Sequence, residues 1–240
     1  MRVALYLVLA AIALVALNFL YQVIRKPTEL FFPVSGVLYK SPPQTWHAYR
    51  ELFRRYSTAH VSAELLAALA QVEASGNPLV RTYWHWAWTA RPFELYRPAS
   101  SAVGMYQMTD ATFAEARHYC IHDHRVVREG AWDEWRACWF NGLYLRVRPA
   151  DAVQLTAADL ELKVAAILAE PGVAAASAPQ LQHLAAVAHL CGAGAASLYA
   201  RRGYRFSAAQ RCGEHDPRVY LARVDALARE FALLAARDDS

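Results

Sequence analysis

The residue best suited to do chemistry in this chain is Glu73, which follows an apolar helical face. Val61, Leu65 and Leu69 recur every four residues, and Glu73 takes the next place in that series. The spacing predicts one amphipathic helix that stops at Gly76. Burial and the negative end of the helix dipole both disfavour the charged form of a carboxylate there. A carboxyl group that keeps its proton near neutral pH can act as a general acid. The alternative is a surface glutamate at a helix end.

A second polar element is the segment Gly104-Met105-Tyr106-Gln107. A glycine permits close approach of the backbone or an unusual turn. The Gln107 side chain donates and accepts hydrogen bonds at once, which suits recognition of hydroxyl and acetamido groups.

A metal site is a weaker reading of the histidines. His118, His122 and His124 cluster beside Cys120 and Asp123, but their spacing fits no standard ligand pattern. We therefore expect no metal.

The four cysteines form no CxxC pair and allow three disulfide connectivities. If the chain is exported, we expect the pairs that are local in sequence, Cys120–Cys138 and Cys191–Cys212.

The composition indicates an all-α protein, because alanine and leucine are abundant and β-branched runs are few. The formal charge is +4 and there is no long run of lysine or arginine, so we expect no nucleic-acid partner.

The first 26 residues predict a transmembrane anchor. Residues 3–24 carry no charged side chain, and 22 residues at 1.5 Å each give about 33 Å, enough for a bilayer core of about 30 Å. The alternative is a cleavable signal peptide, but the apolar run is long for one and lacks a small-x-small cleavage site. The cysteines favour a body outside the cytoplasm.

A proline-containing linker is expected at residues 27–44 and a single helical domain at residues 45–240. The aromatic-rich stretch 79–100 is expected to be a long ordered loop, which could form a wall for stacking sugar rings or a small satellite core. Residues 111–148 are expected to be helical with interruptions.

Three further expectations concern the C-terminal half. Thr156 and Asp159 resemble a capping box that opens a helix. Residues 180–201 predict a helix interrupted by glycines, and the last helix is expected to begin near Asp216-Pro217.

Four short segments are informative because of the order in which they occur within residues 57–230. They are Glu73-Ala74-Ser75-Gly76-Asn77-Pro78, Gly104-Met105-Tyr106-Gln107 followed by Ala111-Thr112, Ala188-His189-Leu190-Cys191-Gly192-Ala193-Gly194, and Asp216-Pro217-Arg218-Val219-Tyr220-Leu221. In that order they resemble the motifs of the soluble lytic transglycosylase-like family of peptidoglycan-cleaving enzymes. The sequence departs from the family pattern where Ala74 replaces a serine and where His189-Leu190 replaces a Tyr-Asn pair.

The resemblance implies a lysozyme-like α-helical fold and a peptidoglycan strand as substrate. Glu73 would be the general acid and base that cleaves the MurNAc–GlcNAc bond with formation of a 1,6-anhydro ring. No cofactor is implied. The expected location is the bacterial inner membrane, with the catalytic domain in the periplasm. The residues expected to contact the glycan are Ser75, Met105, Tyr106, Gln107, His189 and Tyr220.

Two alternatives stay open. One is a noncatalytic glycan-binding or scaffold protein of an envelope-spanning assembly. The other is a hydrolytic lysozyme-like glycosidase, which needs a second carboxylate. The motifs offer few candidates for it, since Glu94 lies in the aromatic stretch and Asp110 is placed to cap a helix.

Overall fold

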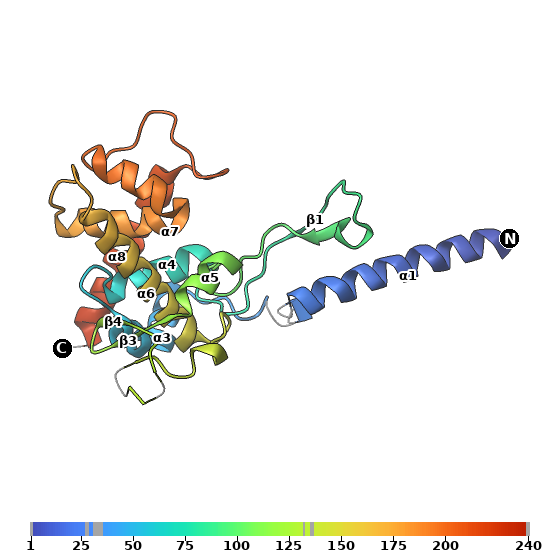
Figure 1. Ribbon diagram of the computed structural model, residues 1–240, viewed down its shortest axis with the longest axis horizontal. Coiled ribbons are helices and arrows are strands. Elements are labelled where there is room, and N and C mark those ends of the chain that lie inside the picture. The colour runs from blue at the N-terminus through green and yellow to red at the C-terminus, as the bar shows by residue number, and fades with distance from the viewer. Residues whose placement is uncertain (1, 27–28, 31–35, 132, 135–136, 239–240) are drawn as a thin grey trace.

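The computed structural model shows a mostly helical chain with two short antiparallel hairpins. One long helix projects from a helical body (Figure 1). The prediction of a helical protein is confirmed, and the two hairpins are additions to it. The residues described are 2–26, 29–30, 36–131, 133–134 and 137–238. Much of the predicted linker, including residues 31–35, lies outside them.

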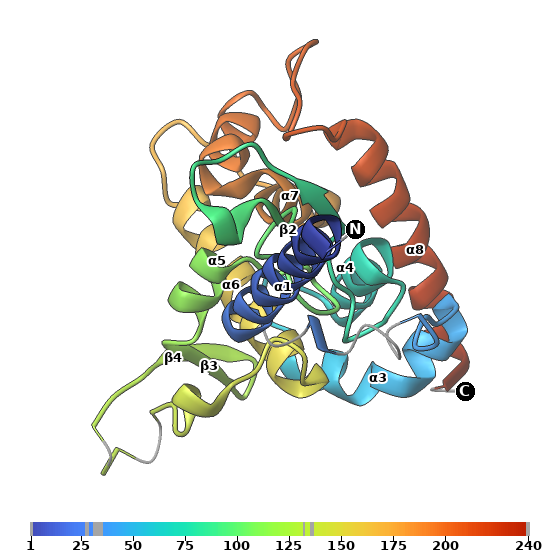
Figure 2. The same ribbon diagram turned by 90° about the vertical axis from the view of Figure 1, so that its right-hand side faces the viewer.

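The helices described are α1 (Arg2–Arg25), α3 (Pro42–Tyr56), α4 (Ala63–Ala74), α5 (Asp110–Ala116), α6 (Pro149–Leu168), α7 (Ala178–Arg201) and α8 (Pro217–Asp238). The strands are β1 (Trp84–Trp86), β2 (Tyr96–Pro98), β3 (Tyr119–His122) and β4 (Arg125–Arg128), and the short 3-10 helices are η2 (Pro92–Glu94) and η3 (Asn141–Leu143). Viewed along α1, α8 runs along one side of the body and the β3–β4 hairpin lies on the other (Figure 2).

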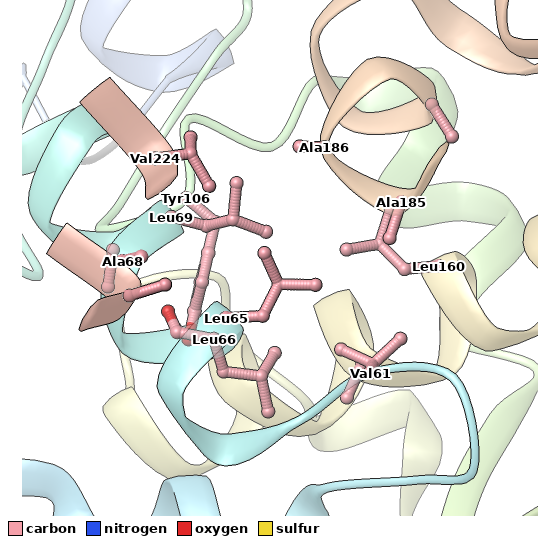
Figure 3. Packing of buried hydrophobic residues seen from close by; sticks show 14 of the residues in the cluster. Val61, Leu65, Leu66, Ala68, Leu69, Tyr106, Leu160, Ala185, Ala186 and Val224 are labelled. Carbon is pink, nitrogen blue, oxygen red and sulfur yellow. The ribbon is translucent and has the colours of Figure 1, made fainter. Parts of the chain in front are cut away.

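Helix α4 lies at the centre of the body, in contact with α3 and α8. Its first turn is capped by Ser62, whose hydroxyl accepts a hydrogen bond from the Leu65 amide. An amphipathic helix with one buried face was predicted, but α4 is buried on every side over residues 65–70. Figure 3 shows Leu65, Leu66 and Leu69 packed among side chains of neighbouring elements. Each buried leucine contributes about 1.5–3 kcal/mol to folding.

The segment that follows α5 was predicted to be helical with interruptions, and this prediction is wrong for residues 119–128. It forms the β3–β4 hairpin, in which Ile121 pairs with Val126 and Cys120 with Val127. The two-residue turn Asp123-His124 has positive φ at both positions, 47° and 62°. Such a turn matches the twist of two paired strands. β-branched residues such as Ile121, Val126 and Val127 favour strands, so hairpin formation outweighs helix propensity here.

The predicted capping box at Thr156 and Asp159 is wrong. Helix α6 already begins at Pro149, so both residues lie well inside it. Proline suits the first helical turn because backbone N–H groups there have no acceptor within the helix, so the lack of an N–H group costs nothing. Helix α3 likewise begins with a proline, Pro42, inside the segment expected to be linker.

The two predicted disulfides are confirmed. Cys120 bonds to Cys138 with Cα atoms 5.6 Å apart, and Cys191 bonds to Cys212 with Cα atoms 5.1 Å apart. The first ties β3 to the segment after the hairpin, and the second ties α7 to the loop before α8.

Helix α1 is exposed along residues 2–17 and is joined to the body at its C-terminal end. There the buried carboxylate of Glu29 accepts hydrogen bonds from Arg81 at 3.1 Å and Trp84 at 2.7 Å, and forms an ion pair with Lys26 at 3.2 Å. Within the described residues, α1 is the one helix long and apolar enough to cross a membrane.

We predict that Gly104→Ala lowers the free energy of unfolding by roughly 1–3 kcal/mol. Gly104 has φ +81°, and an added Cβ would overlap the backbone carbonyl oxygen of Arg146. Thermal unfolding in mild detergent, which covers the exposed apolar side chains of α1, measures the change. Gly142→Ala is the control, because a Cβ there meets nothing within 4 Å. Equal stability of the two variants would contradict the strain argument.

Candidate active site

Residues from three of the four sequence segments meet at one cavity of about 210 Å³. Glu73 reaches it from the end of α4, Gln107 from the loop before α5, and His189 from α7. The fourth segment contributes Tyr220, which contacts Glu73 directly. The residues that line the cavity are Glu73, Gln107, Met108, Thr109, Thr112, Thr156, Asp159, Lys163, His189, Leu190 and His215.

The Glu73 carboxylate is 18% exposed and has two polar neighbours on the same oxygen. The Tyr220 hydroxyl donates a hydrogen bond to Oε1 at 2.6 Å, and His189 Nε2 lies 3.7 Å from that atom. Among the residues described, none forms a hydrogen bond with Oε2. The carboxyl group is therefore held through one oxygen, while the other is available to exchange a proton.

Tyr220 is buried on α8, where burial and then the negative charge of Glu73 raise its pKa well above the ordinary value of 10.0. The phenol thus keeps its proton at neutral pH and stays a hydrogen-bond donor. This bond joins residues 147 positions apart and links α4 to α8.

Helix α4 ends at Ala74, one residue after Glu73, because the next two residues adopt left-handed backbone angles. Ser75 has φ 48° and Gly76 φ 63°. Ser75 serves as the C-cap, with its amide bonded back to α4, and its carbonyl oxygen accepts a hydrogen bond from the Lys40 amide. Ser75 does not line the cavity with the other predicted residues.

The second segment supplies two residues to the cavity lining, Gln107 and Thr112, and of these two Gln107 is the one expected to contact the glycan. Its Nε2 donates hydrogen bonds to the carbonyl oxygens of Gly104 at 2.8 Å and Val80 at 3.4 Å, which fixes the amide plane. The two residues before Gln107 were also expected to contact the glycan, but both are buried. Met105 is inaccessible, and the Tyr106 hydroxyl donates a hydrogen bond to the Leu66 carbonyl oxygen. The Tyr106 ring packs edge-on against His189, so it supports the site from beneath.

The prediction that Gly192 and Gly194 interrupt α7 is confirmed at Gly192 and wrong at Gly194, where the helix continues. Gly192 has non-helical angles, φ 80° and ψ 167°, directly after the cavity residues His189 and Leu190. The disulfide at Cys191 reaches the loop before α8, where His215 also lines the cavity.

Sequence reasoning missed the wall formed by α6, which consists of Thr156, Asp159 and Lys163. Lys163 Nζ lies 2.6 Å from Asp159 Oδ2. Burial raises the pKa of Asp159 above its usual 3.8, and the positive charge of Lys163 opposes that shift. The Thr156 hydroxyl is buried and has no hydrogen-bond partner among the described residues. Polar residues at i, i+3 and i+7 of an apolar helix were the available signal.

Asp159 and Lys163 also belong to a second, larger cavity of about 680 Å³. This cavity continues along α6 and α7 and has charged side chains such as Glu170 and Arg201 in its lining. The two cavities thus share Asp159 and Lys163 in their linings.

Two of the three histidines considered as metal ligands, His118 and His124, have other partners. His118 Nδ1 lies 2.7 Å from Glu129, and His124 Nδ1 lies 2.8 Å from the Ser57 carbonyl oxygen. Within the described ranges, no three side chains of histidine, cysteine, aspartate or glutamate are grouped to hold a metal ion.

In comparisons with known proteins, no family model matches this chain and no curated protein matches it.

We predict that Asp159→Asn stabilises the protein relative to wild type, and that this gain grows as the pH rises from about 4 to about 7. The pKa of Asp159 is higher in the folded than in the unfolded chain. Wild type therefore loses stability as the pH rises through the folded pKa, whereas the neutral asparagine does not. Thermal unfolding across this pH range checks the trend, with Glu51→Gln as the control because its carboxylate is 80% exposed. A gain that does not depend on pH would refute the prediction.

Proposed function

We propose that this chain is a membrane-anchored peptidoglycan lytic transglycosylase with a lysozyme-like domain. One observation carries the proposal: Glu73, Gln107, His189 and Tyr220, which the sequence resemblance selects, come together around one cavity. These four residues belong to four separate segments. Their meeting is what a shared active site requires.

Glu73 would act first as the general acid. Its protonated Oε2 would give the proton to the glycosidic oxygen between MurNAc and GlcNAc, so that the bond to C1 breaks and the GlcNAc side leaves as an alcohol. The Tyr220 hydrogen bond holds Oε1 and turns Oε2 towards the substrate. Positioned proton transfer of this kind contributes roughly 10²–10⁴-fold to the rate.

Glu73 would then act as the base. Its carboxylate takes the proton from the C6 hydroxyl of the same MurNAc, and the C6 oxygen attacks C1 to close the 1,6-anhydro ring. The nucleophile belongs to the substrate, so its effective concentration is already high. The enzyme ends with Glu73 protonated again, ready for another cycle.

The remaining cavity side chains would position the sugar. Gln107 holds its amide rigidly, and its Oε1 accepts no hydrogen bond from the described residues, so it could accept one from an N-acetyl group. Leu190, at the family's asparagine position, lines the cavity as an apolar contact.

The proposed location is the inner membrane, with the body in the periplasm. The exposed apolar surface of α1 supports a membrane anchor, because apolar side chains in contact with water are unfavourable. Two disulfides support an oxidising compartment. An anchor would hold the enzyme between the bilayer and the cell wall.

A hydrolytic glycosidase is the second candidate, and Asp159 is the observation that favours it. This carboxyl group lines the same cavity as Glu73, although no sequence motif predicted it there. In a two-carboxylate mechanism Asp159 would activate water or form a covalent intermediate. Against this role, Lys163 already occupies its Oδ2 at 2.6 Å.

We predict that Glu73→Gln reduces cleavage of purified peptidoglycan at least about 100-fold while the fold stays intact. Glutamine is nearly isosteric and its amide oxygen can still accept the Tyr220 hydrogen bond, but it has no acidic proton. Mass spectrometry of the digest counts anhydro ends and reducing ends. Glu64→Gln is the matched control, since Glu64 lies on the first turn of the same helix. Full activity of Glu73→Gln would overturn the assignment, and no new ends from wild type would favour a glycan-binding protein.

We further predict that Asp159→Asn still yields anhydro-MurNAc ends, with a lower rate because the Lys163 pair is lost from the cavity wall. The product depends on the C6 hydroxyl of the substrate and not on a second carboxylate. The same digest is analysed by mass spectrometry. Reducing ends from wild type that disappear in Asp159→Asn would establish the hydrolase instead.

A further inference from the structure

The aromatic hairpin β1–β2 leaves the helical body and lies along α1 (Figure 1). The Phe19 ring stacks on Trp84 with centroids 5.7 Å apart, and the Tyr21 ring lies 5.6 Å from Phe93. None of the hairpin residues lines the cavity of Glu73. The aromatic stretch is therefore no wall of that cavity, and its rings pack against one another and against α1.

The hairpin backbone accepts one hydrogen bond from each of the two amide side chains of α1. Asn18 Nδ2 donates a hydrogen bond to the Tyr96 carbonyl oxygen at 2.6 Å, and Gln22 Nε2 donates one to the Phe93 carbonyl oxygen at 2.8 Å. Both amides are buried by these contacts. A polar group facing hydrocarbon without a partner is costly, so a helix with amides at these positions is better suited to a membrane when the hairpin covers them.

The length of α1 puts the hairpin at the level of the lipid. Residues 3–17 are all exposed, and at 1.5 Å per residue they extend about 23 Å. A bilayer core is about 30 Å thick. If α1 spans it, the hydrocarbon must continue beyond Leu17 towards Ile24, which is the part of α1 that the hairpin accompanies.

The hairpin carries large aromatic side chains that stay exposed, and one of them, Trp86, lines a small cavity together with Leu14 and Asn18 of α1. Tyr83 is 72% exposed, Trp86 68% and Trp88 fully exposed. Tryptophan and tyrosine are enriched where hydrocarbon meets the headgroups, because their rings are apolar and their N–H or O–H groups are polar. In water the same three side chains would gain nothing from this position.

The contact between the hairpin and the C-terminal end of α1 carries an excess of positive charge. Arg25, Arg91 and Arg97 each lie 3.3–3.4 Å from the Glu94 carboxylate. Three guanidinium groups against one carboxylate leave two positive charges. This charge suits the phosphates of a lipid headgroup layer, to which arginine binds through several donors.

From these observations we propose that the β1–β2 hairpin is a second membrane contact, which lies in the interface of the leaflet from which the body emerges. It rests on the membrane anchoring included in the proposed function. The ligand is the phospholipid surface, with Trp86 and Trp88 among the upper acyl chains and the arginines at the phosphates. Together with the Glu29 junction, this contact would fix the orientation of the body and keep the Glu73 cavity facing away from the bilayer.

The test uses tryptophan fluorescence of the full chain in liposomes of phosphatidylcholine and phosphatidylglycerol. A fraction of the lipid is brominated near the headgroup end of one acyl chain, and bromine quenches tryptophan on contact. Helix α1 contains no tryptophan, so quenching reports the rest of the chain. The variant Trp86→Phe/Trp88→Phe keeps the apolar surface but removes the two reporters. Trp139→Phe is the control, since Trp139 is half exposed on the helical body.

We expect wild type to be quenched, and most of the quenched emission to be lost in Trp86→Phe/Trp88→Phe but kept in Trp139→Phe. Flotation of the liposomes on a density gradient separates the two ways of failing. If the chain floats with the liposomes but the double variant is quenched as much as wild type, the hairpin proposal is overturned and the anchor stands. If the chain does not float, the anchor fails and the hairpin proposal fails with it.

Discussion

The complete burial of α4 is the constraint on which the rest of the structure depends. A helix with no exposed residue from 65 to 70 must be surrounded by other elements, and α3, α6, α7 and α8 contribute to the core that encloses it. This core cannot extend past Glu73, whose carboxylate needs polar partners. The apolar interior therefore ends where the polar cavity begins, and the position of Glu73 follows from the packing of α4.

The polar partners of Glu73 come from distant parts of the chain, and they are asymmetric. Tyr220 and His189 both approach Oε1. A carboxyl group held on one side and open on the other has a defined direction for proton transfer, which an exposed glutamate lacks. Tyr220 keeps this role at neutral pH because its burial opposes ionisation of the phenol.

The same logic governs the other end of the molecule. Asn18 and Gln22 of α1 donate hydrogen bonds to the hairpin backbone, and the Glu29 carboxylate contacts Arg81, Trp84 and Lys26. In both regions, buried polar atoms find partners supplied by residues far away in the sequence. The body and the projecting helix are thus connected by specific bonds and do not rely on a linker alone.

The sequence by itself determined the local features of this protein. Periodicity, glycine and proline act within a few residues, and they account for four features. These are the helix that carries Glu73, the break of α7 at Gly192, the start of α8 at Pro217 and the length of α1. The order of four motifs also selected most of the side chains that meet at the cavity. Only the tertiary structure decided which face of α6 completes that cavity, because Asp159 in an apolar helix is ambiguous until its neighbours are known. It likewise decided that Ser75 and Tyr106 turn away from the cavity, and that the aromatic stretch packs on α1. These outcomes depend on contacts between residues distant in sequence, and no local pattern encodes them.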